Sequence, residues 1–549
     1  MREIGLIVKA LSMVEQGVLF RICGLARLHP EVAFVFSLFM HPPGNSARGS
    51  RISIWLFLLA AWTLVLTEGL RAAGTETAPA ASAEGACLPF DMPSADVFFA
   101  SRRKVFAHYF SPLPLSFDNK EANVDYYATQ YLNPAGENGK WLAHGGYLRT
   151  RPLPVPVVRG GNFLVENLKR EVRLALSRGI TGFAFDILGL GDLRPGSALL
   201  NLIKAAAEVD SRFQIMLMPD MSAFGPDTEP VSKIVRSLYD EPRLSRLADG
   251  RLVVAPFWSE GIDAEGWKSL LDGLSRDGLN IALILTFLNQ KYIPQYLTVG
   301  DGYGTFGTPL PTKRGDIEIG AAASNRQGKL FMAGISGQGY RPKNYRYWES
   351  QGSLAYRSSW LGAIHSRTEW IQLTTWNDFG ETTQVAPFTD ADGSAGTGYF
   401  NLTGYYATWF ATGAPPPLTH DVLYYFHRRQ SVDAIARKAG SQAKNAVFFQ
   451  PGKDMIEVLG FLTAPGSLVV SIDGRSYRKA VDSGVQSFSV PLQNGKPRFS
   501  LVRDGRTVIE FEGNTPISTG AETVNGYADL TYWTGSASAA GTCFSIGIP

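Results

Sequence analysis

Residues 280–287 read NIALILTF, a run in which five apolar residues follow one another without alternation. A strand with one face in water alternates in polarity, whereas a parallel strand covered by helices on both faces is almost continuously apolar. Helical periodicity precedes the run, over 264–274. The stretch therefore predicts a buried parallel strand within an α/β fold.

Similar apolar runs recur along the chain, and segments with helical periodicity separate most of them. The predicted strands are VFAHYFS (105–111), GFAFDILG (182–189), FQIMLMPDM (213–221), RLVVAPFW (251–258), NIALILTF (280–287), a weaker run at 304–307, LFMAGISG (330–337) and WIQLTTWND (370–378). The predicted helices are 162–178, 197–209, 231–239, 264–274 and 355–365. Eight runs in this alternation favour a (β/α)8 TIM barrel over residues 101–428. The alternative is an open doubly wound sheet, but the expected glycine-rich turn after the first strand is missing from 105–116 (VFAHYFSPLPLS).

The alternation stops near the sequence APPPL at 414–418. Short strand patterns follow from about residue 432, and turn-forming pairs such as Asp-Gly and Asn-Gly separate them. The patterns are NAVFFQ, DMIEVLGFLT, GSLVVSIDG, VQSFSVPL, RFSLVRDG and TVIEFEG. They predict an all-β, sandwich-like accessory domain over residues 429–549.

The N-terminal part of the chain predicts export. Residues 52–66 (ISIWLFLLAAWTLVL) are an apolar run that follows Arg48 and Arg51. The run has the length of a signal peptide and is short of the roughly 20 residues that span a bilayer. We therefore expect an N-terminal extension over 1–73 that holds a signal peptide, or a membrane anchor where the run is not cleaved. A linker over 74–100 should follow, and the protein should be secreted or periplasmic.

Cleavage of the signal would remove Cys23 and leave Cys87 and Cys543 of the three cysteines in the chain. In an oxidising compartment these two can form a disulfide that ties the start of the folded part to its end. The alternative is two unpaired thiols.

Composition and motifs exclude several classes of function. The formal net charge is +3 over 549 residues and no basic block stands out, so nucleic acid is not an expected partner. The sequence has neither an HExxH zinc motif nor a GxSxG nucleophile elbow. We expect a monomer with no metal and no cofactor. The aromatic fraction of 12% suits a polysaccharide partner, because flat aromatic faces stack on sugars.

Polar residues end several predicted strands, and the carboxyl ends of the strands are where barrel active sites lie. These residues are His108, Tyr109, Asp186, Asp220, Trp258, Glu260, Trp376, Asn377, Asp378 and Glu381. Taken singly, such an aspartate is more often a helix cap or turn former. Together they predict an acidic, aromatic cleft that binds substrate. Two carboxylates that flank a sugar bond are the working parts of glycoside hydrolysis.

The motifs around these residues resemble a known family. VFAHYF (105–110), GITGFAFDILG (179–189), MLMPDMS (216–222) and WIQLTTWNDFGETTQVAP (370–387) are similar to glycoside hydrolase family 71, the α-1,3-glucanases or mutanases. Residues 339–360 resemble the stretch that precedes the last barrel strand of that family. The most specific motif is WND-x-GE.

The resemblance implies a (β/α)8 barrel that hydrolyses α-1,3-glucan with inversion. It places the acid/base pair on WND-x-GE, with Asp378 as general base and Glu381 as general acid, in roles that can be exchanged. Asp186 and Asp220 would bind sugar hydroxyls or tune the pair. The implied subsite residues are His108, Tyr109, Trp258 and Trp376.

The segment between 112 and 162, rich in Tyr, Gly and Pro, departs from the family pattern. The glycan and its linkage therefore stay open, and an endo-α-mannosidase-like activity is one alternative. A catalytically silent barrel that only binds polysaccharide is another. The presence of both carboxylates, Asp378 and Glu381, argues against a silent barrel.

Overall fold

The computed structural model describes residues 87–344, 346–433, 435, 452–519 and 527–543. The apolar run at 52–66, Cys23 and the predicted strand NAVFFQ (445–450) lie outside the described residues. Within the described part of the chain, no helix combines the length and the apolar character needed to cross a membrane.

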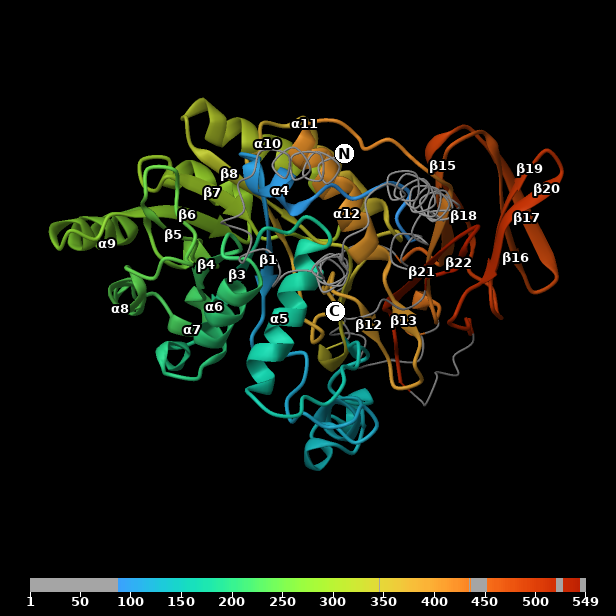
Figure 1. Ribbon diagram of the computed structural model, residues 1–549, viewed down its shortest axis with the longest axis horizontal. Coiled ribbons are helices and arrows are strands. Elements are labelled where there is room, and N and C mark those ends of the chain that lie inside the picture. The colour runs from blue at the N-terminus through green and yellow to red at the C-terminus, as the bar shows by residue number, and fades with distance from the viewer. Residues whose placement is uncertain (1–86, 345, 434, 436–451, 520–526, 544–549) are drawn as a thin grey trace, which may run out of the picture. The chain divides into compact units, whose positions relative to one another are not determined.

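Parallel strands close into a barrel with the order β1-β11-β8-β7-β6-β5-β4-β3 (Figure 1). The barrel strands are β1 (Lys104–Tyr109), β3 (Gly182–Ile187), β4 (Gln214–Pro219), β5 (Leu252–Val254), β6 (Ile281–Phe287), β7 (Gly302–Thr305), β8 (Leu330–Ile335) and β11 (Trp370–Leu373). The first strand closes the ring by pairing with both β3 and β11. The (β/α)8 TIM barrel predicted from the sequence is confirmed.

Helices connect most of the barrel strands. They are α5 (Phe163–Leu176), α6 (Ala198–Val209), α7 (Met221–Phe224), α8 (Glu229–Leu238), α9 (Ala264–Arg276), α10 (Lys313–Arg326), α11 (Leu354–His365) and α12 (Gly398–Thr412), with the 3₁₀ helix η7 (Gln290–Tyr296) after β6. Asn162, Ser197 and Asp263 each accept a hydrogen bond from a backbone amide in the first turn of α5, α6 and α9. These side chains satisfy amides that have no partner within the helix.

Successive side chains of each barrel strand alternate between the barrel interior and the helix layer. In β1, Phe106 packs inside the barrel, while Val105, Ala107 and Tyr109 pack in the core that the helices share with the sheet. The same period places His108 on the inner face. This alternation decides which polar residues reach the mouth of the barrel.

The long helices α10 and α12 and the short helix α7 were not predicted. Helix α12 is buried on nearly every side, so it lacks the apolar stripe of a surface helix. Helix α10 contains Gly315 and Gly320 and a weak apolar pattern. Residues 87–100 also differ from the linker that composition predicts. They contain α4 (Ala95–Ala100), and Leu88, Phe90 and Phe98 are buried in the barrel core.

Antiparallel strands build the C-terminal region. One sheet has the order β18-β15-β14-β21-β22 and another has the order β17-β16-β19-β20 (Figure 1). The strands are β14 (Val422–Arg428), β15 (Met455–Leu462), β16 (Gly466–Ile472), β17 (Arg475–Val481), β18 (Gly484–Pro491), β19 (Arg498–Arg503), β20 (Arg506–Glu512), β21 (Tyr532–Ser538) and β22 (Gly541–Thr542). Apolar residues of both sheets share one core. Strand β14 precedes the predicted boundary at residue 429, yet it pairs with β15 and β21 and so belongs to this region.

Cys87 and Cys543 form a disulfide with their Cα atoms 5.7 Å apart. The bridge confirms the pairing that the sequence left open against two free thiols. It joins the start of the described chain to the end of the β-rich region. Buried ion pairs add to this connection, since Arg428 of β14 contacts Glu349 at 3.0 Å.

Candidate active site

Polar side chains on the inner face of the barrel meet at the carboxyl ends of neighbouring strands. His108 of β1 lies with its Nε2 atom 3.6 Å from Oδ2 of Asp186, the last but one residue of β3. The amide of Gln372 in β11 lies 3.4 Å from Nδ1 of His108. The other carboxylate oxygen of Asp186 is buried without a hydrogen-bond partner among the described residues. The structure therefore brings His108 and Asp186 together, as the sequence predicts.

The loop after β11 curls around Asp378. The backbone amide of Glu381 donates to Oδ1 of Asp378 at 3.0 Å, and the amide of Asp378 donates to the hydroxyl of Thr375 at 2.8 Å. Asn377 braces the same loop, because its side chain accepts from the amide of Phe110 at 2.7 Å and donates to the carbonyl of Phe110 at 3.0 Å. Asn377 is thus buried and supports the loop, whereas the sequence predicts a substrate-binding residue.

The two carboxylates of the loop have different surroundings. Asp378 is 8% exposed. Burial, followed by the negative charge of Glu381, raises the pKa of Asp378 to about 7. The hydrogen bond from the backbone amide of Glu381 and the positive charge of Arg341 oppose that rise in pKa without cancelling it. Near neutral pH the carboxyl of Asp378 can therefore either hold or release a proton.

Glu381 is more exposed and forms an ion pair with Arg341 at 2.5 Å. Arg341 ends β9 (Gly339–Arg341), which pairs with β10 (Arg346–Trp348) as a hairpin. The amide of Tyr340 donates to the carbonyl of Glu381 at 2.8 Å, and this bond fixes the hairpin against the loop after β11. Sequence reasoning missed Arg341. Arg341 lies within residues 339–360, which resemble the family, but no sequence spacing predicts which carboxylate a loop arginine will pair with.

A family model for glycosyl hydrolase family 71 matches residues 157–545. The chain belongs to glycosyl hydrolase family 71. The resemblance noted in the sequence is confirmed, and the protein is a glycoside hydrolase.

The family 71 hydrolase is similar to fungal proteins over most of their length. A glucan endo-1,3-alpha-glucosidase of Schizosaccharomyces pombe is 25% identical over 381 residues, which cover 64% of this chain and 87% of the relative. An ascus wall endo-1,3-alpha-glucanase of the same yeast is 26% identical over 408 residues, covering 65% and 90%. Among solved structures, the GH99 endo-alpha-mannosidase from Bacteroides thetaiotaomicron matches with a TM-score of 0.45 and 15% identity, over 56% of this chain and 97% of that chain.

Asp220 of the family 71 hydrolase caps a helix beside the mouth of the barrel. Its Oδ1 atom accepts from the amide of Ser222 at 2.7 Å and from the hydroxyl of Ser222 at 2.6 Å, at the start of α7. Burial, followed by the charge of Asp186, raises the pKa of Asp220. Asp220 therefore caps the next helix, which is the ordinary role of an aspartate after a strand. It also lies near Asp186, so it adds a second carboxyl at this end of the barrel.

Tyr109 and Trp376 of the hydrolase face the helix layer around the barrel. Both are buried on the outer side of the barrel, where the hydroxyl of Tyr109 donates to Glu171 at 2.9 Å and the indole of Trp376 donates to Glu171 at 3.1 Å. Both side chains are almost fully buried, whereas the sequence predicts subsite residues with exposed rings. Tyr109 has the register of the helix-facing residues in β1.

Glu171 is a buried carboxyl of α5 that sequence reasoning missed. Burial raises the pKa of Glu171 to about 7, and the hydrogen bonds from Trp376 and Tyr109 oppose that rise. Helix α5 is amphipathic, and Glu171 occupies one of its apolar positions. This misplaced glutamate was the sequence signal that could have indicated a buried carboxyl. Through Trp376, Glu171 supports the loop that carries Asp378.

Trp258 and Glu260 follow β5, and Glu260 connects this loop to the loop after β6. The carboxylate of Glu260 accepts from the amide of Leu288 at 3.1 Å and from the amide of Asn289 at 3.3 Å. Trp258 is half-buried against the outer core and has a left-handed backbone with φ 56°. Neither forms a hydrogen bond with Asp378 or Glu381 among the described contacts.

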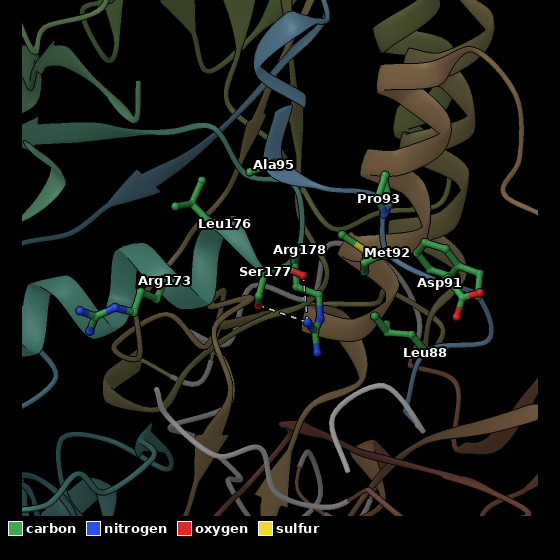
Figure 2. Close-up of a pocket in the computed structure, with 10 residues that line it drawn as sticks. Leu88, Asp91, Met92, Pro93, Ala95, Arg173, Leu176, Ser177 and Arg178 are labelled. Carbon is green, nitrogen blue, oxygen red and sulfur yellow. Dashed lines mark hydrogen bonds between the residues drawn. The ribbon is translucent and has the colours of Figure 1, made fainter. Parts of the chain in front are cut away.

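A large open pocket lies on another part of the hydrolase (Figure 2). It has a volume of about 590 Å³ and is lined by residues that precede β1 and by the C-terminal end of α5. Arg178 is one of the lining residues and donates to the carbonyl of Ser177 at 2.9 Å. These residues lie before β1 and β3 begin, so the pocket belongs to the end of the barrel opposite the carboxylates. Among the described residues, no group of three or more His, Cys, Asp or Glu side chains could hold a metal ion.

Proposed function

We propose that this protein is an exported glycoside hydrolase that cleaves α-1,3-glucan, with Asp378 and Glu381 as its acid/base pair. The observation that carries the proposal is the loop after β11, in which one carboxyl is buried and the other is ion-paired within the same turn. The names of the fungal relatives support α-1,3-glucan as the substrate.

The reaction needs one carboxyl to donate a proton to the oxygen of the leaving sugar and the other to accept a proton from the attacking water. The bond from the anomeric carbon to the glycosidic oxygen breaks as the bond to water forms. One direct attack by water inverts the anomeric configuration, so we infer an inverting mechanism.

Of the two carboxyls, the surroundings favour Asp378 as the protonated one. Its pKa of about 7 keeps part of the carboxyl protonated at neutral pH, whereas the ion pair with Arg341 requires the carboxylate form of Glu381. This distribution is the reverse of the roles that the family resemblance implies. The pair itself is the same under either assignment.

Export rests on separate observations. Residues 52–66 have the length and flanking arginines of a signal peptide. The disulfide between Cys87 and Cys543 suits an oxidising compartment such as the periplasm or the cell exterior. We infer a catalytic barrel over 101–428 and an accessory β-rich domain after it, with the polysaccharide as the partner of the barrel.

The test is hydrolysis of defined glycans by the purified chain that begins at residue 74. Reducing ends should appear from α-1,3-glucan and not from dextran or α-mannan, and NMR of the first products should show the β anomer. Release from α-mannan alone would replace the glucan by a mannoside substrate. The α anomer as first product would overturn inversion.

A further inference from the structure

The segment between β1 and α5 carries a cluster of aromatic residues. Most of this segment lies before residue 157, where the match to the family begins. Tyr147 is central to the cluster. Its ring stacks on Trp141 at 4.9 Å with an interplanar angle of 29° and meets Tyr131 edge-on at 4.9 Å.

The cluster shares a core with the catalytic loop. Phe379, which lies between Asp378 and Gly380, is buried with Tyr127 and Leu148, and Tyr147 packs against this core. Strand β2 (Arg151–Pro152) pairs with β12 (Phe388–Thr389), and the side chain of Gln384 donates to the hydroxyl of Thr150 at 3.1 Å. The segment is thus fixed to the WND-x-GE motif and to the residues that follow it.

The hydroxyl of Tyr147 approaches the carboxyl of Asp378 across Gly380. A Cβ atom placed on Gly380 would lie 3.1 Å from the hydroxyl of Tyr147 and 3.2 Å from Oδ1 of Asp378. Only a residue without a side chain leaves this space open. Within the described part of the chain, the hydroxyl of Tyr147 forms no hydrogen bond, whereas those of Tyr126 and Tyr127 are held by Glu137 and by the carbonyl of Pro114.

The electrostatics agree with this position. Burial, followed by the charge of Asp378, raises the pKa of Tyr147 to about 12. The charge of Glu381 adds to the rise in this pKa. The phenol therefore stays protonated throughout the range in which carboxyl pairs work, and it is available as a hydrogen-bond donor.

We propose that Tyr147 is a further catalytic residue, whose hydroxyl donates a hydrogen bond to the sugar oxygen that exchanges a proton with Asp378. The inference rests on the proposed role of Asp378. It adds a donor from a segment outside the matched part of the chain. A rigid donor aimed where charge develops in the transition state lowers the barrier without reorganisation during the reaction. The stacked ring of Trp141 and the edge-on ring of Tyr131 hold the phenol in place.

The test compares Tyr147→Phe with Tyr126→Phe, a matched control from the same cluster whose hydroxyl is bound to Glu137. Kinetics are measured on whichever α-glycan the wild type cleaves best, so that a wrong substrate assignment does not affect the comparison. Loss of one transition-state donor should lower kcat/KM by about 10²-fold to 10³-fold in Tyr147→Phe. Tyr126→Phe should stay within about twofold, with both melting temperatures unchanged.

Gly380→Ala tests the same space by a second route, because its methyl group would lie 3.1 Å from the hydroxyl of Tyr147 and 3.2 Å from Oδ1 of Asp378. It should lower kcat/KM about as much as Tyr147→Phe, and the double variant should lose little more than either single one. Losses that multiply in the double variant, or a Tyr147→Phe enzyme within about threefold of wild type, would overturn the proposal. A fully active Asp378→Asn enzyme would instead overturn the proposed acid/base pair.

Discussion

The backbone amide of Glu381 points at the side chain of Asp378 and donates to its Oδ1 atom at 3.0 Å. The bond holds the two residues of WND-x-GE in one turn, so that one carboxyl is buried while the other faces Arg341. Neighbouring carboxyls with different surroundings have different proton affinities. The turn therefore gives the two carboxyls the different proton affinities that the proposed acid/base roles need.

Asp378→Asn and Glu381→Gln should each lower kcat on the natural glycan by at least about 10²-fold, the usual contribution of a general acid or base. Both changes keep the size of the side chain, and binding of oligosaccharide measured by calorimetry should stay close to that of wild type. Glu260→Gln is the matched control, because Glu260 accepts from a backbone amide, that of Leu288, and has no hydrogen bond with Asp378 or Glu381 among the described contacts. Near-normal turnover in either of the first two variants would contradict the assignment.

An α-glycosyl fluoride separates the two roles, because fluoride leaves with little help from a proton donor. If Asp378 is the acid, Asp378→Asn should keep most of its activity on the fluoride while Glu381→Gln loses it. The opposite pattern would return the roles that the family resemblance implies. Release of fluoride, followed with an ion-selective electrode, gives the measurement.

Arg341→Met should shift the pH profile of kcat/KM. The charge of Arg341 lowers the pKa of Asp378, so its removal should raise that pKa above about 7 and move the corresponding limb of the profile to higher pH. The direction of the shift is the same whether Asp378 acts as acid or base. Arg314→Met is the control, because Arg314 pairs with Glu318 on the exposed face of α10. An unshifted limb in Arg341→Met would show that Arg341 does not act on Asp378.

The sequence predicted the barrel well because its strands are buried on both faces and read as continuous apolar runs. The same property hid which way each side chain points. VFAHYF contains no polar alternation, so nothing in it separates His108 on the inner face from Tyr109 on the outer one. The carboxylates Asp378 and Glu381 were found because polar residues that follow a barrel strand reach its mouth.

Partners from distant segments could not be predicted in the same way. Glu171 meets Tyr109 and Trp376 only because α5 packs beside β1 and the loop after β11. Such contacts depend on tertiary packing and leave no fixed spacing in the sequence.

Removing the disulfide should destabilise the folded protein. The bridge between Cys87 and Cys543 closes a loop with a sequence separation of 456 residues. Cross-links stabilise mainly by restricting the unfolded chain, and we expect Cys87→Ser to lower the free energy of unfolding by about 3–5 kcal/mol. Urea unfolding of the variant and wild type without reductant gives the difference. Addition of dithiothreitol should bring the wild type to the level of the variant, and equal stabilities before reduction would show that the bridge is not formed.

Glu171→Gln should remove part of the pH dependence of stability. The folded pKa of Glu171, about 7, lies above its ordinary value of 4.5, so the folded protein binds the proton more tightly than the unfolded chain. Stability from this group is then greatest below about pH 4.5 and falls as the pH rises toward 7, by about 3 kcal/mol in total.

Gln keeps an oxygen that can accept from Trp376 and an amide that can donate to the hydroxyl of Tyr109, and it has no charge to bury. Urea unfolding at pH 5 and pH 8 should therefore show a smaller loss of stability in Glu171→Gln than in wild type, and Glu166→Gln, an exposed neighbour on α5, should behave as wild type. Equal losses in Glu171→Gln and wild type would mean that Glu171 does not take up a proton on folding.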